Sequence, residues 1–219
     1  MTRPLLIIGT GGFARETAAA VRADPEGRWQ LVGFLDDDPS RVGTAVDGIK
    51  VLGPSDEVSD HPEASVVVCT GNPRDYASRH RIVRRLGLDA ERYATIVHPS
   101  SSIGYGSTVG VGTVLLAHAV LTADVTIGIH VACMPHVTLT HDDVVEDFST
   151  MASGVGVGGS TRIGTGAYLG AGAVLREGVT IGDWSLIGAG SLVLSDIPAR
   201  CVAYGQPARP IRSTAPRLD

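Results

Sequence analysis

VHPSSSIGYGSTVGVGTVL, residues 97–115, begins a pattern that continues to Val193 and decides the fold. Every sixth residue from Val97 to Val193 is apolar, at seventeen positions with no slip of phase. Four residues after each of the first sixteen comes a small or β-branched residue, except at Asp143. A period of six is the signature of a parallel β-helix. Three hexads make one triangular coil, so residues 18 apart are expected to stack at ~4.8 Å.

Composition excludes several classes of partner. The chain has 28 glycines and 5% aromatic residues, as expected where tight corners alternate with small stacked side chains. A net charge of −5 gives no general attraction for nucleic acid or anionic lipid. No apolar run approaches the ~20 residues of a membrane span. We therefore expect a protein with no nucleic-acid partner and no membrane span.

The start of the chain and its cysteines point to the cytoplasm. Residues 4–8, PLLII, read directly as a strand, without the basic segment and cleavage site of a secretory signal. Cys69, Cys133 and Cys201 are unevenly placed, at a strand end, a core hexad position and the tail. We expect buried free thiols in a reducing compartment and no disulfide framework.

The region before the hexads resembles half of a nucleotide-binding fold. Residues 5–8 read as a buried strand, followed by a glycine turn and a helix over about 13–23. This arrangement aims backbone N–H groups at a phosphate. Further strands are expected over 30–35, 49–52 and 66–69, and about four strands suit one nucleotide better than a dinucleotide.

Polar residues follow two of these strands. Asp36, Asp37 and Asp38 come at the carboxyl end of the second strand, where ligands of parallel sheets bind. From composition alone, a solvated turn before Pro39 is the safer interpretation of these aspartates. The last strand leads to a helix reaching about Leu86, in which Arg74 could reach a phosphate. The later arginines are expected to be solvated: Arg79, Arg81, Arg84 and Arg85.

We expect three parts: residues 1–93, a Rossmann-like nucleotide-binding domain, 94–205, a β-helix, and 206–219, a C-terminal tail. No flexible linker separates the first two, so a rigid junction is expected. Residues 213–219 are expected to be disordered.

Histidines supply two competing sites in the β-helix. His141 lies beside Asp142, and a carboxylate can hold an imidazole in one tautomer and make it a better base. A surface corner without function is an equally open interpretation. His118 and His136 are 18 apart and should stack, and with His141 they could hold a catalytic zinc. That set resembles the ligand spacing of γ-class carbonic anhydrases.

The whole chain resembles the sugar-nucleotide N-acetyltransferases that modify 4-amino sugars, together with the related sialic acid O-acetyltransferases. The match runs through residues 9–14, the segments FLDD (34–37) and GN (71–72), LTHD (139–142) and GQPAR (205–209). The resemblance implies an α/β plus all-β fold, with a small Rossmann-like domain followed by a left-handed parallel β-helix. It also implies acetyl-CoA as co-substrate and a homotrimer with active sites between neighbouring β-helices.

The resemblance also assigns residues. His141 is implied to be the catalytic base and Asp142 its orienting carboxylate. Acetyl-CoA is expected to lie along a groove lined by Gly159, Ala171 and Ala189. The nucleotide sugar is expected to contact seven residues of the first domain: Gly11, Gly12, Phe13, Asp36, Asp37, Gly71 and Asn72.

Three positions depart from some relatives. Phe13 stands where some have a histidine, Thr150 replaces a histidine that contacts the cofactor, and Asp142 replaces a glutamate. The change at Phe13 bears on which nucleotide is selected, and the change at Thr150 bears on the cofactor contact. Asp142 is one methylene shorter than the glutamate in the same role.

The expected reaction is acetyl transfer from acetyl-CoA to the amino group of a nucleotide-linked 4-amino-4,6-dideoxy sugar, for glycan or O-antigen biosynthesis. The amine attacks directly, with His141 as general base and no metal. Three alternatives stay open: sugar O-acetylation on the same fold, a zinc lyase, and a non-catalytic nucleotide-sugar sensor. The sequence leaves the nucleotide open among UDP, GDP and dTDP.

Overall fold

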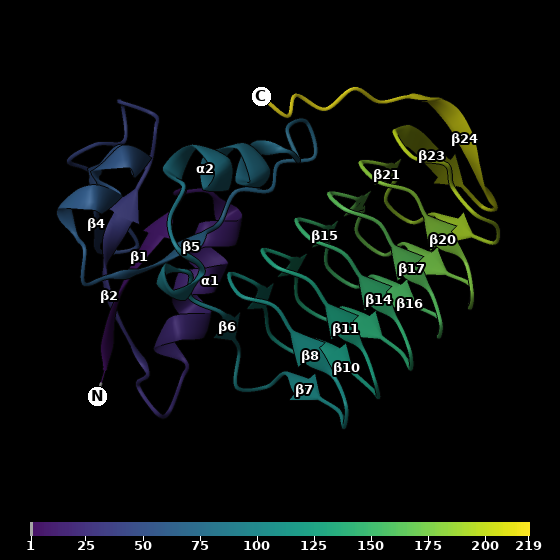
Figure 1. The fold of residues 1–219 in the computed structure, drawn as a ribbon, viewed down its shortest axis with the longest axis horizontal. Helices are drawn as coiled ribbons and strands as arrows, with labels where there is room; N and C mark the ends of the chain where they lie inside the picture. The colour runs from purple at the N-terminus through teal and green to yellow at the C-terminus, as the bar shows by residue number, and fades with distance from the viewer. Residues whose placement is uncertain (1) are drawn as a thin grey trace.

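Apolar runs separated by glycine-rich turns fold the first part of the chain into a five-stranded sheet in the computed structural model, which describes residues 2–219 (Figure 1). The strand order is β3-β4-β2-β1-β5, with β3 antiparallel to β4 and the other neighbours parallel. The strands are β1 (Arg3–Ile8), β2 (Trp29–Leu35), β3 (Ala45–Val46), β4 (Ile49–Gly53) and β5 (Ser65–Val68). The predicted strands are confirmed; only β3, two residues long, has no signal in the pattern.

Two α-helices accompany this sheet, α1 (Gly12–Arg22) and α2 (Ser78–Leu86). Two short 3₁₀ helices, η1 (Ser55–Asp60) and η2 (Ala90–Arg92), lie in the connections. Helix α1 begins at the glycine turn, as predicted. Helix α2 begins later than the sequence suggests, because a hydrogen-bonded turn over residues 72–75 comes first.

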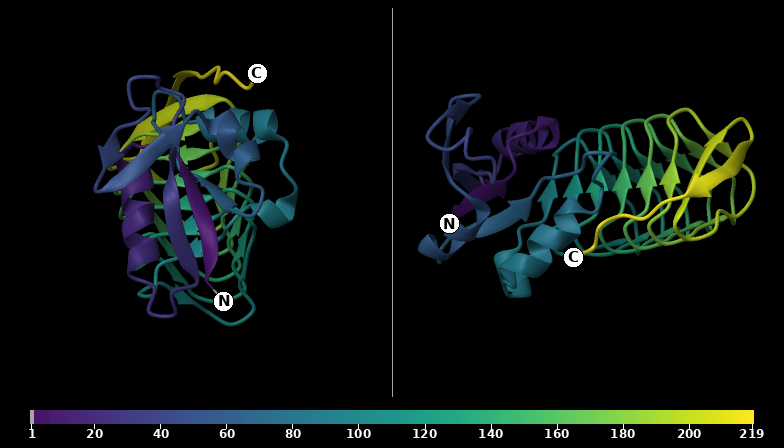
Figure 2. Two further views of the ribbon diagram at one scale, coloured as in Figure 1. Left: turned by 90° about the vertical axis from the view of Figure 1, so that its left-hand side faces the viewer. Right: turned by 90° about the horizontal axis from the view of Figure 1, so that it is seen from above.

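The hexads form a β-helix with one two-residue strand per hexad, β6 to β22. Parallel pairing joins residues 18 apart, such as Val120 with Thr138. The apolar residues of the hexads point inward and make one continuous core, except Ile103 in the first coil, which is 44% exposed. The strands form three sheets, the faces of a triangular prism, as the hexad pattern predicts (Figure 2).

We number the faces in chain order. Face 1 contains β6 (Ile96–Val97), β9 (Val114–Leu115), β12 (Ala132–Cys133), β15 (Thr150–Met151), β18 (Tyr168–Leu169) and β21 (Leu186–Ile187). Face 2 contains β7 (Ser102–Ile103), β10 (Val120–Leu121), β13 (Thr138–Leu139), β16 (Gly156–Val157), β19 (Val174–Leu175) and β22 (Leu192–Val193). Face 3 contains β8 (Thr108–Val109), β11 (Thr126–Ile127), β14 (Val144–Val145), β17 (Arg162–Ile163) and β20 (Thr180–Ile181).

Each corner between faces needs one residue with positive φ, and such a residue recurs every six positions from Gly106 to Gly190. Glycine fills many of these positions because it adopts that conformation without steric cost. His118, His136 and Asp142 occupy others, with φ of 61°, 63° and 61°. We call the corner between faces 1 and 2 the first corner, between faces 2 and 3 the second, and between faces 3 and 1 the third.

A hairpin closes the β-helix at its C-terminal end. Strand β23 (Cys201–Gly205) extends face 1 and pairs antiparallel with β24 (Ala208–Ser213), so the hairpin crosses the boundary expected at residue 205. The remaining residues run back along the coils toward α2 (Figures 1 and 2). There the Arg81 guanidinium donates to the Arg217 carbonyl at 2.8 Å. The prediction of disorder over 213–219 is therefore wrong.

The small domain packs on face 1 and the third corner. Helix α1 buries Ala14 and Ala18 against Val114 and Leu116, while Tyr76 packs with Trp184 and donates to its carbonyl at 2.9 Å. The three cysteines are free and buried, as predicted. Within residues 2–219, no helix combines the length and apolar character needed to cross a bilayer.

Candidate active site

A cavity of about 570 Å³ opens at the carboxyl ends of β1, β2 and β5. Six of the seven residues expected to contact a nucleotide sugar line it: Gly11, Gly12, Phe13, Asp36, Gly71 and Asn72. The other lining residues, which sequence reasoning missed, are Gly9, Thr10, Cys69, Thr70, Pro73, Asp75 and Ser78. Most of them follow β5 directly, so their place after a buried parallel strand was the available signal.

The glycine turn gives this cavity its anion-binding character. Gly9 has a φ of +102°, and a Cβ there would lie 2.9 Å from the Cys69 carbonyl oxygen, so the turn requires glycine. Gly11 caps α1 without a side-chain hydrogen bond. The first N–H groups of a helix have no partner within it, and a phosphate is a suitable acceptor.

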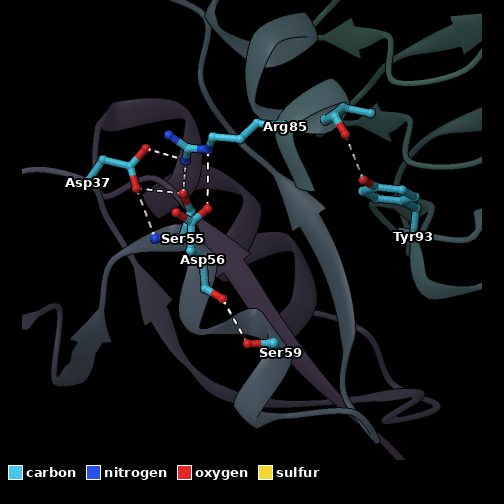
Figure 3. Close-up of polar contacts among 7 residues, drawn as sticks. Asp37, Ser55, Asp56, Ser59, Arg85 and Tyr93 are labelled. Carbon is cyan, nitrogen blue, oxygen red and sulfur yellow. Dashed lines mark hydrogen bonds and ion pairs between the residues drawn. The ribbon is translucent and has the colours of Figure 1, made fainter. Parts of the chain in front are cut away.

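The two neighbouring aspartates take different roles. Asp36 lines the cavity, and its carboxylate accepts the Thr10 hydroxyl at 2.5 Å and the Asp38 N–H at 3.0 Å. Asp37 does not line it; its carboxylate accepts the Ser55 N–H at 2.9 Å and pairs with the Arg85 guanidinium at 2.7 Å (Figure 3). Partial burial pushes the pKa of Asp37 upward, but hydrogen bonds from Ser55 and Arg85 outweigh it and lower that pKa. Asp37 therefore fastens β2 to η1 and α2.

The arginines of α2 are not the solvated set that the sequence suggested. Arg79 is 1% exposed and spans the domain junction, and the expectation of a solvated side chain is wrong for it. It donates to the carbonyls of Thr70 and His130, each at 2.7 Å, and to the Thr150 hydroxyl at 2.8 Å. Burial lowers the pKa of Arg79 to about 10. Thr150 is thus engaged inside the junction.

His141 and Asp142 form the pair that the sequence predicted, on the second corner. The imidazole Nδ1 lies 2.8 Å from the Asp142 carboxylate, and both side chains are exposed. The hydrogen bond to Asp142 raises the pKa of His141, and the charges of Asp142, Asp143 and Glu177 raise it further. With Nδ1 engaged, Nε2 is the nitrogen that can take up a proton.

Gly159 lies one coil above His141, and a Cβ there would come within 2.5 Å of Cε1 and Nε2 of the imidazole. The imidazole ring therefore occupies space that any side chain at position 159 would fill. Ala171 and Ala189 are exposed on the first corner instead, so one chain does not bring the three expected acetyl-CoA contacts into one groove.

The zinc alternative depends on three imidazoles that the fold separates. His118 and His136 stack on the first corner, with ring centroids 5.0 Å apart, as predicted. His141 is on the second corner, so its expected meeting with His136 does not occur within one chain. Across residues 2–219 there is no group of three or more His, Cys, Asp or Glu that could hold a metal ion.

Two family models match the chain. The PglD N-terminal domain matches residues 4–86, and the bacterial transferase hexapeptide, six repeats, matches residues 160–195. No curated protein sequence matches the chain.

Solved structures resemble nearly the full length. The acetyltransferase domain of PglB from Neisseria gonorrhoeae FA1090, in complex with acetyl coenzyme A, is 28% identical with a TM-score of 0.85, covering 96% of this chain and 100% of that one. A histidine-to-asparagine mutant of perosamine N-acetyltransferase from Caulobacter crescentus, in complex with CoA and GDP-perosamine, is 25% identical with a TM-score of 0.84, covering 96% and 97%. WeeI from Acinetobacter baumannii AYE, 23% identical, shares the fold, with a TM-score of 0.79 over 96% of this chain and 100% of that one.

The resemblance expected from the sequence is confirmed. The chain joins a PglD N-terminal domain to hexapeptide repeats, and two structures similar to both parts together, the PglB domain and perosamine N-acetyltransferase, are acetyltransferases.

Proposed function

We propose that this hexapeptide-repeat acetyltransferase moves the acetyl group of acetyl-CoA to the 4-amino group of a nucleotide-linked 4-amino-4,6-dideoxy sugar. The product would serve glycan or O-antigen biosynthesis. The observation that carries the proposal is the exposed His141–Asp142 pair, 2.8 Å apart, in a chain that also builds a cavity at the N-terminus of α1. The perosamine N-acetyltransferase structure holds CoA and GDP-perosamine, which supports this substrate class.

The chemistry requires a base because an amine attacks a thioester only as the free base. The amine nitrogen bonds to the thioester carbon, and Nε2 of His141 takes up the nitrogen's proton. Asp142 stabilises the imidazolium through Nδ1. The tetrahedral oxyanion collapses, the C–S bond breaks and CoA leaves as the thiol once protonated. A backbone N–H at a β-helix corner suits the oxyanion.

We propose a homotrimer because the geometry of one chain separates its catalytic parts. The small domain covers face 1, and the second corner, with His141, is opposite that face in a triangular prism. The cavity of one copy and the His141 of the same copy therefore point to different sides. A site with both needs the His141 of another copy.

The outward residues of the faces favour face 2 as the contact between copies. Those of face 2 include Val120, Val174 and Leu192, and Val174 is 48% exposed. Those of face 3 are mostly polar: Thr108, Thr126, Val144, Arg162 and Thr180. Three prisms with face 2 toward a common axis place the second corner of one copy beside the first corner of the next. Gly159 of one copy would then approach Ala171 and Ala189 of its neighbour, forming the acetyl-CoA groove.

The decisive experiment offers UDP-, GDP- and dTDP-linked 4-amino-4,6-dideoxy sugars with acetyl-CoA to the purified protein. Release of free thiol and a product heavier by one acetyl group are expected with at least one of them. Matched sugars with a 4-hydroxyl form the second arm. Acetylation of only the hydroxyl sugars would replace this proposal with O-acetylation, and binding without turnover of any sugar would favour the sensor alternative.

A further inference from the structure

Asp143 is the one residue that interrupts the small-residue series of the hexads, and it is 0% exposed. A buried carboxylate is costly unless hydrogen bonds compensate for the lost water. Both of its oxygens accept backbone N–H groups. One accepts from Thr140 at 2.8 Å, and the other accepts from Thr161, in the next coil, at 2.9 Å.

The bond to the next coil has counterparts elsewhere. The Ser107 hydroxyl accepts the Val125 N–H at 3.1 Å, and the Thr113 hydroxyl accepts the Val131 N–H at 2.9 Å. Each joins residues 18 apart, as Asp143 and Thr161 do. A serine or threonine at position 143 would be sufficient for this contact alone.

The bond to Thr140 has no such counterpart. In the coil below, the Thr122 N–H donates to the Leu139 carbonyl at 3.1 Å, and in the coil above, the Gly158 N–H donates to the Leu175 carbonyl at 3.0 Å. The Thr140 N–H donates to the Asp143 carboxylate instead. The Thr140 hydroxyl donates to the Val157 carbonyl at 2.9 Å, in place of the N–H. The regular ladder is thus altered at the residue that precedes His141.

We propose that Asp143 is a positioning residue for acetyl transfer: by drawing the Thr140 N–H out of the ladder, it sets the corner that presents His141. The inference rests on the proposed function for its catalytic consequence. Only a carboxylate offers two acceptors and no donor here, which explains why this hexad departs from the series.

The charge of Asp143, like its hydrogen bond to Thr140, affects His141. Burial raises the pKa of Asp143 to about 6, against lowering by the N–H groups of Thr161 and Thr140 and by His141, so the carboxylate is ionised above about pH 6. The charged groups around the imidazole are Asp142 on the same corner, Asp143 behind it and Glu177 two coils above. All are negative and favour the imidazolium, so removing Asp143 should lower the pKa of His141.

The test uses Asp143→Ser, which retains an acceptor for the Thr161 N–H, with Ser107→Ala as matched control. Ser107→Ala removes an equivalent bond between coils on the same corner, two coils below His141. Misplacing a catalytic group by about 1 Å can cost on the order of 10²-fold. We expect kcat of Asp143→Ser to fall about tenfold to a hundredfold, with both KM values within about threefold of wild type and the pKa of His141 lowered in an NMR titration. Ser107→Ala should keep kcat and that pKa.

Wild-type kcat and an unchanged His141 pKa in Asp143→Ser would overturn the proposal, leaving Asp143 a structural residue. If Asp143→Ser fails to fold, the near-isosteric Asp143→Asn takes its place, judged by the same two readouts. If the wild-type protein acetylates no sugar, the proposed function fails, while the NMR titration still decides whether Asp143 sets the state of His141.

Discussion

Two corners of the same β-helix carry histidines in nearly the same backbone frame. On the first corner, His118 and His136 occupy the left-handed positions and stack on one another, 5.0 Å apart. On the second corner, Asp142 holds the left-handed position, and His141, just before it, meets its carboxylate at 2.8 Å. The repeat thus supplies the frame at both corners, and the neighbouring carboxylate distinguishes a candidate base from a stacked pair.

Replacing the histidines tests this contrast most strongly. A positioned general base contributes ~10²–10⁴-fold, so His141→Asn should lower kcat by that factor with both substrates still bound. Because Asp142 raises the pKa of His141, the wild-type kcat/KM should rise with pH through a value above the ordinary ~6.5 of histidine. That limb should vanish in His141→Asn. The control His136→Asn leaves the His141–Asp142 pair intact and should retain that limb; its loss there would break the contrast.

Removing the carboxylate tests the cause of the contrast. Asp142→Asn keeps the size of the side chain but loses the charge that holds the imidazole. We expect kcat to fall about tenfold to a hundredfold, less than in His141→Asn, because the base remains but is less well oriented. The pKa of His141 should fall, which moves the limb of kcat/KM to lower pH. An unmoved limb in the pH profile would assign the orienting role to another group.

Displacing the imidazole without changing its chemistry gives the next effect. Gly159→Ala puts a Cβ within 2.5 Å of the imidazole, so the ring must move, and kcat should fall by about tenfold. Gly159 is also an expected acetyl-CoA contact, so the same change is made in His141→Asn protein. Little further loss of kcat is expected there, and an undiminished tenfold loss would show that Gly159 acts independently of His141.

Binding variants should behave differently from corner variants. Asp36→Ala removes a carboxylate that lines the cavity and should raise KM for the nucleotide sugar about tenfold, or ~1.4 kcal/mol, with little change in KM for acetyl-CoA. Asp37→Ala breaks contacts to Ser55 and Arg85 and should lower thermal stability more than it changes KM. If Asp36→Ala and Asp37→Ala raised KM for the nucleotide sugar equally, both aspartates would be substrate-binding residues.

The smallest effect is expected from metal removal. Strong chelator should leave acetyl transfer within about twofold of the untreated protein, because the proposed reaction uses His141 as the proton acceptor and involves no metal. Metal content is measured by elemental analysis before and after treatment. One tightly held zinc per chain, with activity lost on its removal, would contradict this prediction. It would show that the histidines of the two corners act in one metal site.

Much of the fold could be predicted because its pattern is local. Each hexad carries its own apolar residue and its own corner, so a period of six fixes the strands and the pairing of residues 18 apart. The His141–Asp142 pair could be predicted for the same reason, since its members are adjacent in sequence. The location of the cavity could also be predicted, because the strand, the glycine turn and helix α1 follow one another directly in the sequence.

The partners of charged side chains could not be predicted from adjacent residues. Arg79 and Arg85 occupy one short helix, yet the first is buried against β-helix carbonyls and the second pairs with Asp37. Asp36 and Asp37 are neighbours that point to different surroundings, because successive residues at a strand end diverge.

By itself, the sequence determined the β-helix, its register, the glycine turn and the His141–Asp142 pair, since each depends on residues close together or on a fixed period. Only the tertiary structure decided that the small domain covers face 1 and that His141 is on the opposite corner. It also decided that Asp143 draws the Thr140 N–H out of the ladder. These features depend on which surfaces pack together after the coils have stacked. Burial and hydrogen bonding between segments distant in sequence determine that packing.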